Sequence, residues 1–235
     1  MGSYAESIMF VRHEIRQTRK TLVATAVLAA LFLIGMTGTS GSSWCTITVS
    51  TSDSLRDAVE ILPPGSIICL QPGAYEVGFE IKRDLTLRGN GSARSVVVTS
   101  TGEADEPALS FYSYYGGAFC VSLENLTVTG AVGEDPDAAR RYAHGLFIDH
   151  DVHAVLRKGV CSDNEGAGVY VDRNSSLVAY DCTFTDNQYG AFLDAGSSAR
   201  FDECVFSLNM LGVVLGRDCQ MLLQDCVFMG SDLHC

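Results

Sequence analysis

The chain has 235 residues, a formal net charge of −12 and 47% hydrophobic residues. Its first 44 residues hold four basic and two acidic side chains, so 12 basic and 26 acidic ones follow, a net charge of −14. Binding to nucleic acid depends on clustered Lys and Arg, and this charge therefore argues against a nucleic-acid partner. It also disfavours polyuronate chains unless calcium bridges the carboxylates.

The first predicted element is an uncharged, mostly apolar run at residues 21–37. A helix needs about 17 to 25 such residues to span a bilayer. Basic residues precede the run, and nothing charged follows until Asp53, which predicts a cytoplasmic amino terminus. We therefore expect a cytoplasmic segment at 1–20, a transmembrane signal anchor at 21–37, a linker at 38–45 and an extracytoplasmic domain at 46–235. The alternative is a cleaved signal peptide and a secreted domain, because the run is short and Gly38 and Ser40 are small.

The next segment predicts a short helix that leads into strands. Ser52 or Asp53 can cap a helix with Leu55, Val59 and Leu62 on one face, and the sequence Pro-Pro-Gly at 63–65 ends it. Strands are expected at 66–70 and 81–89, with a Pro-Gly-Ala-Tyr turn at 72–75 between them.

The second half of the chain repeats with a period of 22 or 23 residues. Gly-x-x-x-Asp starts at Gly145, Gly168 and Gly190, and three further columns keep the period. These are Cys182, Cys204 and Cys226; Phe184, Phe206 and Phe228; Asn164, Asn187 and Asn209. A repeat of this length built from strands predicts a solenoid, in which each coil buries its apolar face against its neighbours.

Two of these columns predict structural roles. Asn tolerates the left-handed backbone conformation of a sharp corner, and stacked Asn side chains can bond from coil to coil. The cysteines share the face of the phenylalanines, so we expect small buried thiols rather than disulfides. The other six cysteines leave room for one or two bridges.

These segments resemble the right-handed parallel β-helix proteins of the pectin-lyase-like superfamily, over residues 46–235. The most specific part is the helix at 54–60 followed by the strand at 66–70, the turn at 72–75 and the strand that ends in Leu-Thr-Leu-Arg-Gly at 85–89. The resemblance implies an all-β, right-handed parallel β-helix of roughly seven or eight coils, with the helix covering its first coil. It also implies a carbohydrate-related function.

The candidate site is the column Asp149, Asp172 and Asp194, which ends the same strand on successive coils. Neighbouring carboxylates about 5 Å apart could bind a divalent cation or raise one pKa. Polysaccharide lyases of the superfamily hold calcium on such aspartates and use a basic residue to take a proton. The resemblance thus implies Ca²⁺ on the three aspartates, with Arg173 as the basic group and His150 beside it. Paired carboxylates of a glycoside hydrolase are the alternative enzyme.

Ordinary turn chemistry competes with both enzyme interpretations. An Asp after a strand commonly bonds the backbone of the following turn. The polygalacturonase motifs N-T-D, D-D, G-H-G and R-I-K are missing from the sequence. His144, His150 and His153 form a local enrichment of histidines. The segment 149–153 could present the imidazoles of His150 and His153 and two carboxylates to a metal, but strand alternation splits them between faces.

We therefore expect a membrane-anchored, outward-facing protein that binds or processes a polysaccharide, with a non-catalytic scaffold or adhesion module as the rival. The segment 130–142 is long enough to wall a binding groove, and Tyr112, Tyr114 and Tyr115 could stack on sugar rings. The last repeat stops at Cys235 without a closing cap. We therefore expect a partner or a loop to cover that end of the solenoid, or the natural chain to be longer.

Overall fold

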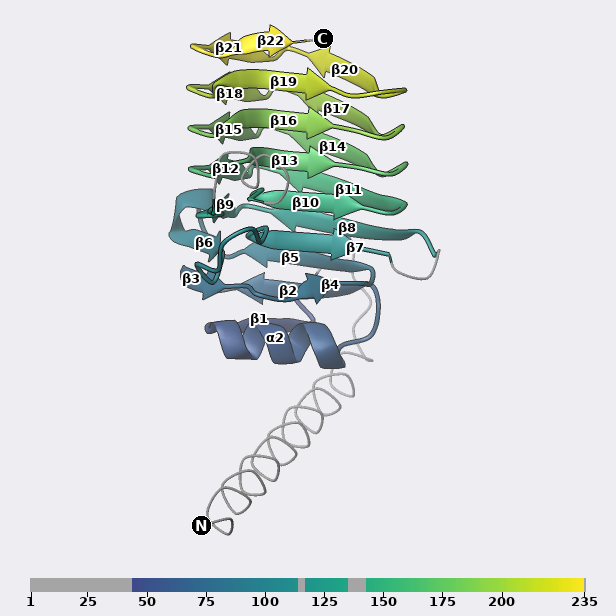
Figure 1. The fold of residues 1–235 in the computed structure, drawn as a ribbon. Coiled ribbons are helices and arrows are strands. Elements are labelled where there is room, and N and C mark those ends of the chain that lie inside the picture. Colours follow the sequence, from purple (N-terminus) through teal and green to yellow (C-terminus); the bar gives the residue numbers. More distant parts are fainter. Residues whose placement is uncertain (1–43, 114–116, 135–142, 235) are drawn as a thin grey trace, which may run out of the picture.

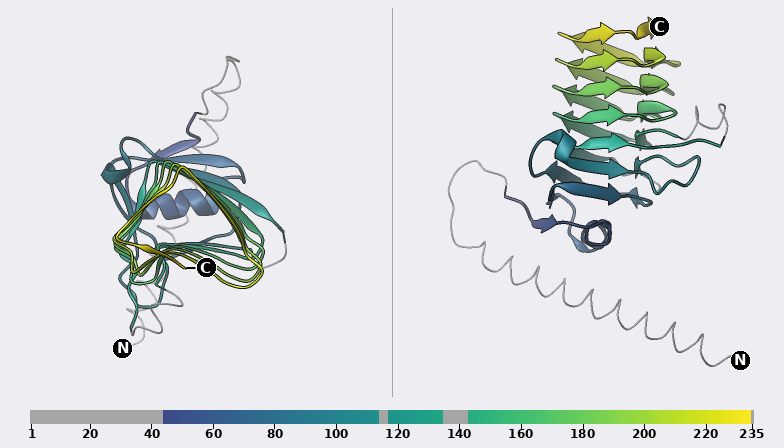
Figure 2. Two further views of the ribbon diagram at one scale, coloured as in Figure 1. Left: turned by 90° about the horizontal axis from the view of Figure 1, so that it is seen from above. Right: turned by 90° about the vertical axis from the view of Figure 1, so that its left-hand side faces the viewer.

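The computed structural model describes residues 44–113, 117–134 and 143–234, and it forms a stack of triangular coils (Figures 1 and 2). Each coil contributes one strand to each of three sheets, in which all strand pairs are parallel. Seven complete coils run from β2 to β22, in agreement with the predicted β-helix of roughly seven or eight coils.

Sheet A has eight strands: β1 (Ile47–Val49), β2 (Ser66–Leu70), β5 (Leu85–Gly89), β8 (Phe119–Glu124), β11 (Val152–Arg157), β14 (Ser176–Tyr180), β17 (Ser198–Asp202) and β20 (Gln220–Gln224). Sheet B has seven: β3 (Gly73–Glu76), β6 (Val96–Thr99), β9 (Thr127–Thr129), β12 (Val160–Ser162), β15 (Thr183–Thr185), β18 (Val205–Ser207) and β21 (Val227–Met229). Sheet C also has seven: β4 (Glu80–Ile81), β7 (Leu109–Tyr112), β10 (Leu146–Asp149), β13 (Ala167–Val171), β16 (Tyr189–Leu193), β19 (Leu211–Leu215) and β22 (Asp232–His234).

The core is one continuous apolar column inside the stack. Alternate strand residues point inward, so β14 buries Leu177 and Ala179 while Val178 between them faces outward. The repeated phenylalanines stack from coil to coil, with ring centroids 5.0 Å apart between Phe184 and Phe206. In-register stacking brings identical side chains together, which explains why these columns repeat in the sequence.

A helix covers the first coil, as expected. Helix α2 (Ser52–Ile61) buries Leu55, Ala58 and Val59 against the stack and lies below β1 in Figure 1. Its cap differs from the prediction, because the Thr51 side chain accepts the backbone N–H of Ser54 and the Ser54 side chain returns a bond to Thr51. This reciprocal capping box satisfies two groups that a cap at Ser52 or Asp53 would leave open. A 3₁₀ turn, η1 (Ala93–Ser95), precedes β6.

The asparagine column forms a hydrogen-bonded ladder at the turn between sheets B and C. Asn164 Nδ2 donates to Asn187 Oδ1 (2.9 Å), and Asn187 Nδ2 donates to Asn209 Oδ1 (3.0 Å). The predicted left-handed residue is wrong by one position, since the preceding Asp163, Asp186 and Leu208 have φ near +55° (54°, 57° and 54°). Asn serves this turn through its buried side chain rather than through its backbone.

The glycine column marks close contact between coils on sheet C. A Cβ on Gly190 would lie 2.4 Å from the Gly212 carbonyl oxygen, and one on Gly168 would lie 2.8 Å from that of Gly190. The thiols of Cys182 and Cys204 are buried and free, as predicted, whereas the free Cys226 on the last described coil is only half-buried. One disulfide joins Cys45 to Cys69 next to α2.

Within the described ranges, no helix is long and apolar enough to cross a membrane. The predicted cytoplasmic segment and anchor at 1–37, and all of the linker except residues 44 and 45, lie outside the described residues. Exposed apolar side chains near the last coil include Leu222, Val227 and Met229. A partner over that end stays a prediction.

Candidate functional site at the turn between sheets C and A

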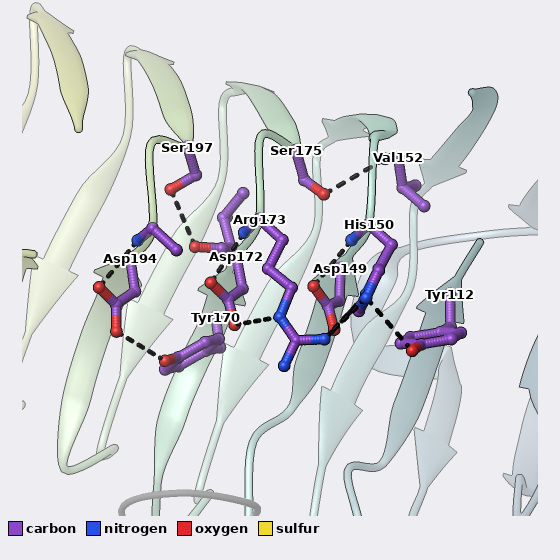
Figure 3. Close-up of polar contacts among 12 residues, drawn as sticks. Tyr112, Asp149, His150, Val152, Tyr170, Asp172, Arg173, Ser175, Asp194 and Ser197 are labelled. Atoms are coloured by element: carbon purple, nitrogen blue, oxygen red, sulfur yellow. Dashed lines mark hydrogen bonds and ion pairs between the residues drawn. The ribbon is translucent and has the colours of Figure 1, made fainter. Parts of the chain in front are cut away.

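The predicted aspartate column lies where sheet C turns into sheet A (Figure 3). Ile148 pairs with Val171 and Val171 with Leu193, so the following residues Asp149, Asp172 and Asp194 stack on successive coils. The next column brings His150 beside Arg173, as the sequence spacing predicted. We call Tyr112, Asp149, His150, Asp172 and Arg173 the edge cluster.

Each aspartate of the column holds its own turn. Oδ1 accepts the backbone N–H of the next residue at 2.7 Å in Asp149, 2.7 Å in Asp172 and 2.8 Å in Asp194. The residues that donate are left-handed, with φ of 58° at His150, 46° at Arg173 and 49° at Ala195. The turn function expected as an alternative is therefore present at all three positions.

One aspartate does more than hold its turn. Asp149 is 2% exposed, and its Oδ2 lies 2.7 Å from Nδ1 of His150. Arg173 Nη1 lies 2.7 Å from His150 Nε2. The same Nη1 lies 3.3 Å from Nδ1, so this guanidinium nitrogen lies near both ring nitrogens of His150. Because a carboxylate has only acceptors, the contact with Asp149 places an N–H on Nδ1.

Arg173 connects two coils across the surface. Its side chain is 55% exposed, with Nη1 3.5 Å from Asp149 Oδ2 and Nε 3.9 Å from Asp172 Oδ2. Burial, followed by the charges of Asp149 and Asp194, raises the pKa of Asp172, although Arg173 and the turn hydrogen bond act in the opposite direction. Arg173 is held by weak, exposed contacts and can turn toward a ligand.

Tyrosines flank the cluster on both sides. The ring of Tyr112 lies 4.3 Å from that of His150, and its hydroxyl is 3.3 Å from Nε2. On the other side the Tyr170 hydroxyl donates to Asp194 Oδ2 (3.3 Å), and burial together with neighbouring carboxylates raises the pKa of this phenol. Tyr170 belongs to an outward-facing stack with Phe147 and Phe192.

The predicted metal ligands do not converge. Across the described parts of the chain, no group of three His, Cys, Asp or Glu side chains is placed to hold a metal ion. The three histidines are also separated: His144 is fully buried against Tyr170, His150 lies in the turn, and His153 bonds Ser176 on the outer face of sheet A. Calcium on Asp149, Asp172 and Asp194 therefore stays a prediction without a formed site behind it.

A cavity that the sequence did not indicate adjoins the edge cluster. It has a volume of about 600 Å³, and its wall includes Tyr112 of the cluster together with Lys82, Arg83, Asp84 and Phe119. These residues come from the turn between β4 and β5 and from the strands β7 and β8, in the part of the chain where the 22-residue period does not hold. The expected neighbours Tyr114 and Tyr115, and residues 135–142 of the predicted loop, lie outside the described residues.

The fold and site define a parallel β-solenoid with one polar, partly exposed edge. The chain belongs to the right-handed β-helix family, whose sequence profile, described as "Right handed beta helix region", matches residues 109–233. The sequence-based resemblance is thereby confirmed. The comparison with curated proteins gave no match.

Solved structures share the fold at low identity. A protein of Geobacillus virus E2, ORF18, has a TM-score of 0.60 and 15% identity, and the alignment covers 77% of this chain but 38% of the viral chain. The pectin methylesterase PemA from Erwinia chrysanthemi has a TM-score of 0.51 and 15% identity, with 81% of this chain and 68% of the enzyme covered. Such likenesses concern the fold, and this chain spans well under half the length of the viral protein.

Proposed function

We propose that this protein binds a polysaccharide along the turn between sheets C and A. The observation that carries the proposal is the arrangement at His150, where a guanidinium, an imidazole, a phenol and a carboxylate meet at a partly exposed surface beside a cavity. Saccharides are recognised through hydroxyl groups that both donate and accept. The edge cluster offers Arg donors, carboxylate acceptors and an aromatic ring within three successive coils.

The geometry favours binding of a saccharide through the polar groups of the edge cluster rather than by stacking of sugar rings on the outward-facing aromatic side chains. The faces of Tyr170 in the outward stack are covered by Phe147 and Phe192, with centroids 5.6 and 5.1 Å away. A sugar ring can therefore meet only the edges of these rings. The polar groups of Arg173 and His150, in contrast, can exchange their mutual bond for bonds to a ligand at small cost, because Arg173 is exposed.

A processing activity is the second candidate, favoured by the contact between Asp149 and His150. In a neutral imidazole whose Nδ1–H faces Asp149, Nε2 carries the free electron pair of a general base. Arg173 Nη1 lies 2.7 Å from Nε2, so catalysis requires Arg173 to move onto the substrate. The fold shared with a pectin methylesterase is consistent with this candidate.

We also propose that the β-helix lies outside the cytoplasm, joined to the membrane by residues 21–37. The apolar run and its basic flank support this, and the Cys45–Cys69 disulfide fits an oxidising compartment. Carbonate extraction and external protease treatment of cells test it. Release of the full-length chain by carbonate argues for secretion instead.

The binding proposal is tested by retention of the full-length chain in detergent on a panel of neutral and acidic polysaccharides, with and without calcium. Arg173→Gln should reduce retention about tenfold, which is the loss expected when one charged hydrogen-bonding group is removed. Arg94→Gln is the matched control, because Arg94 is an exposed arginine on η1 in the turn at the other edge of sheet A. Product release from any polymer supports processing, whereas no retention and no product on the whole panel favours the scaffold alternative.

A further inference from the structure

The cavity beside the edge cluster has a charge arrangement unlike the rest of the acidic surface. Its wall holds Glu80, Lys82, Arg83 and Asp84, with Phe119 and Pro64 as apolar lining. A volume of about 600 Å³ falls within the range of about 300–1,000 Å³ typical of ligand sites. Two cations in one cavity require an explanation in a domain that carries 26 acidic and 12 basic residues.

The two cations have different partners. Lys82 Nζ forms an ion pair with Glu80 Oε2 at 2.5 Å. Arg83 Nη1 donates to the backbone carbonyl of Leu62 at 2.9 Å. In the portion of the chain that the structure describes, Arg83 forms no ion pair with a carboxylate.

The backbone bond holds Arg83 ready for an anion. Leu62 is the C-cap residue of α2 and is 3% exposed, so its carbonyl is a rigid acceptor for one guanidinium nitrogen. The remaining Nε and Nη2 donors of a guanidinium can bind an oxyanion side-on through two parallel hydrogen bonds. The neighbouring Asp84 is already engaged, because its Oδ1 accepts the backbone N–H of Cys120 at 2.7 Å.

The position of the cavity restricts how a ligand can enter it. Pro64 belongs to the connection between α2 and β2, and α2 covers the first coil on that side (Figure 1). Tyr112 is shared by the cavity and the edge cluster, which continues to His150 and Arg173 on the next coils. A saccharide that occupies both places would run from the cavity along the edge toward Arg173.

We propose that this cavity binds the terminal sugar of the polysaccharide through one oxyanion group, held by Arg83. The inference rests on the proposed function, since it names the subsite in which the bound chain ends. A carboxylate, a sulfate ester and a phosphate share the required chemistry, namely at least two coplanar oxygens that carry negative charge. Binding of only one such group agrees with the net charge of −14 beyond residue 44, which opposes a chain with a charge on every unit.

Two neighbouring variants should change the affinity in opposite directions. Arg83→Gln removes the oxyanion partner and should weaken binding about tenfold, or about 1.4 kcal/mol. Asp84→Asn keeps an oxygen for the Cys120 N–H but removes a like charge from the cavity wall. The affinity of the Asp84→Asn variant for a saccharide with an anionic terminal sugar should rise about threefold. This is the gain expected when the repulsion between the Asp84 carboxylate and a ligand charge several Å away in a solvated site is removed. Because a damaged fold cannot strengthen binding, the second variant separates the proposal from loss of structure.

The experiment is calorimetric titration of the full-length chain with oligosaccharides of one neutral backbone whose terminal sugar is unmodified, a uronate, sulfated or phosphorylated. We expect at least one anionic form to bind more tightly than the unmodified form, with Arg83→Gln cancelling the difference and Arg94→Gln preserving it. Wild-type-like affinity of Arg83→Gln for every form, together with weak binding by Arg173→Gln, overturns the cavity inference and leaves the proposed function intact. Failure of the wild type to bind any form overturns both.

Discussion

Replacement of Asp149 separates the turn role of the edge from its binding role. Oδ1 of Asp149 accepts the backbone N–H of His150 at 2.7 Å, and Oδ2 lies 2.7 Å from Nδ1 of the same residue. Asp149→Asn keeps an oxygen for the backbone bond but turns an amide N–H₂ toward the imidazole N–H. Asp149→Ala removes both acceptors from a side chain that is 3% exposed.

The two variants should differ by one hydrogen bond to a charged group. Such a bond contributes about 1.5–3 kcal/mol, so we expect the free energy of unfolding to fall by about 2 kcal/mol for Asn and about 4 kcal/mol for Ala. A domain of this size loses about 2–4 °C of melting temperature per kcal/mol. The expected decreases are therefore roughly 4–8 °C and 8–16 °C. Circular dichroism melting curves and polysaccharide retention should be measured on the same preparations.

Both variants should lose binding, because His150 and Arg173 lose their common acceptor. Asp194→Asn is the matched control, since its turn bond to Ala195 survives and no histidine follows it. Equal destabilisation by Asn and Ala would refute the assignment of two separate bonds. Full retention by Asp149→Asn would show that orientation of His150 has no part in binding.

Three further predictions concern the scaffold. Asn187→Ala breaks the buried ladder, because the Asn164 backbone N–H loses its acceptor, Asn187 Oδ1, and the Cys161 carbonyl loses the Asn187 Nδ2 donor. Asn209 Oδ1 loses the same side-chain donor but keeps the backbone N–H of residue 187. The free energy of unfolding measured in urea should therefore fall by about 2–4 kcal/mol. Because the pKa of Asp172 is raised in the folded state, its ionised form destabilises the fold. This penalty is present above the folded-state pKa and is lost as the pH falls toward the pKa of the unfolded state. Asp172→Asn should therefore have a higher melting temperature than wild type at pH 7 and lose that gain near pH 4. Iodoacetamide should label exposed Cys120 in the native protein but not buried Cys161, because burial raises the pKa of the Cys161 thiol. Labelling is detected by mass spectrometry, and labelling of Cys161 before unfolding would contradict the packing.

The repeating columns made the coil stack predictable because stacked coils place identical residues in contact. Phe184 and Phe206 repeat because their rings touch, and Asn187 repeats because it bonds both neighbours. The strand β14 and its equivalents have no such signal, since their outward residues change from Ser176 to Gln220 along one column. Each coil therefore contains one strand that no column of identical residues marks.

The site was predictable only where it follows the period. The interval of 23 residues places Arg173 beside His150, and the contact is present. Tyr112 lies 38 residues before His150, across a longer coil, so no fixed spacing could pair them. The contact between Asp149 and His150 and the anchoring of Arg83 depend on side-chain directions that no sequence pattern encodes.

Hydrogen–deuterium exchange of the full-length chain with and without a retained polysaccharide tests the central claim most directly. Binding at the edge cluster should slow exchange in peptides that contain the turns at 149–152 and 172–175, and should leave the turn between sheets B and C unchanged. Protection confined to the asparagine ladder or to the outer face of sheet A, with no change at His150 and Arg173, would contradict the account.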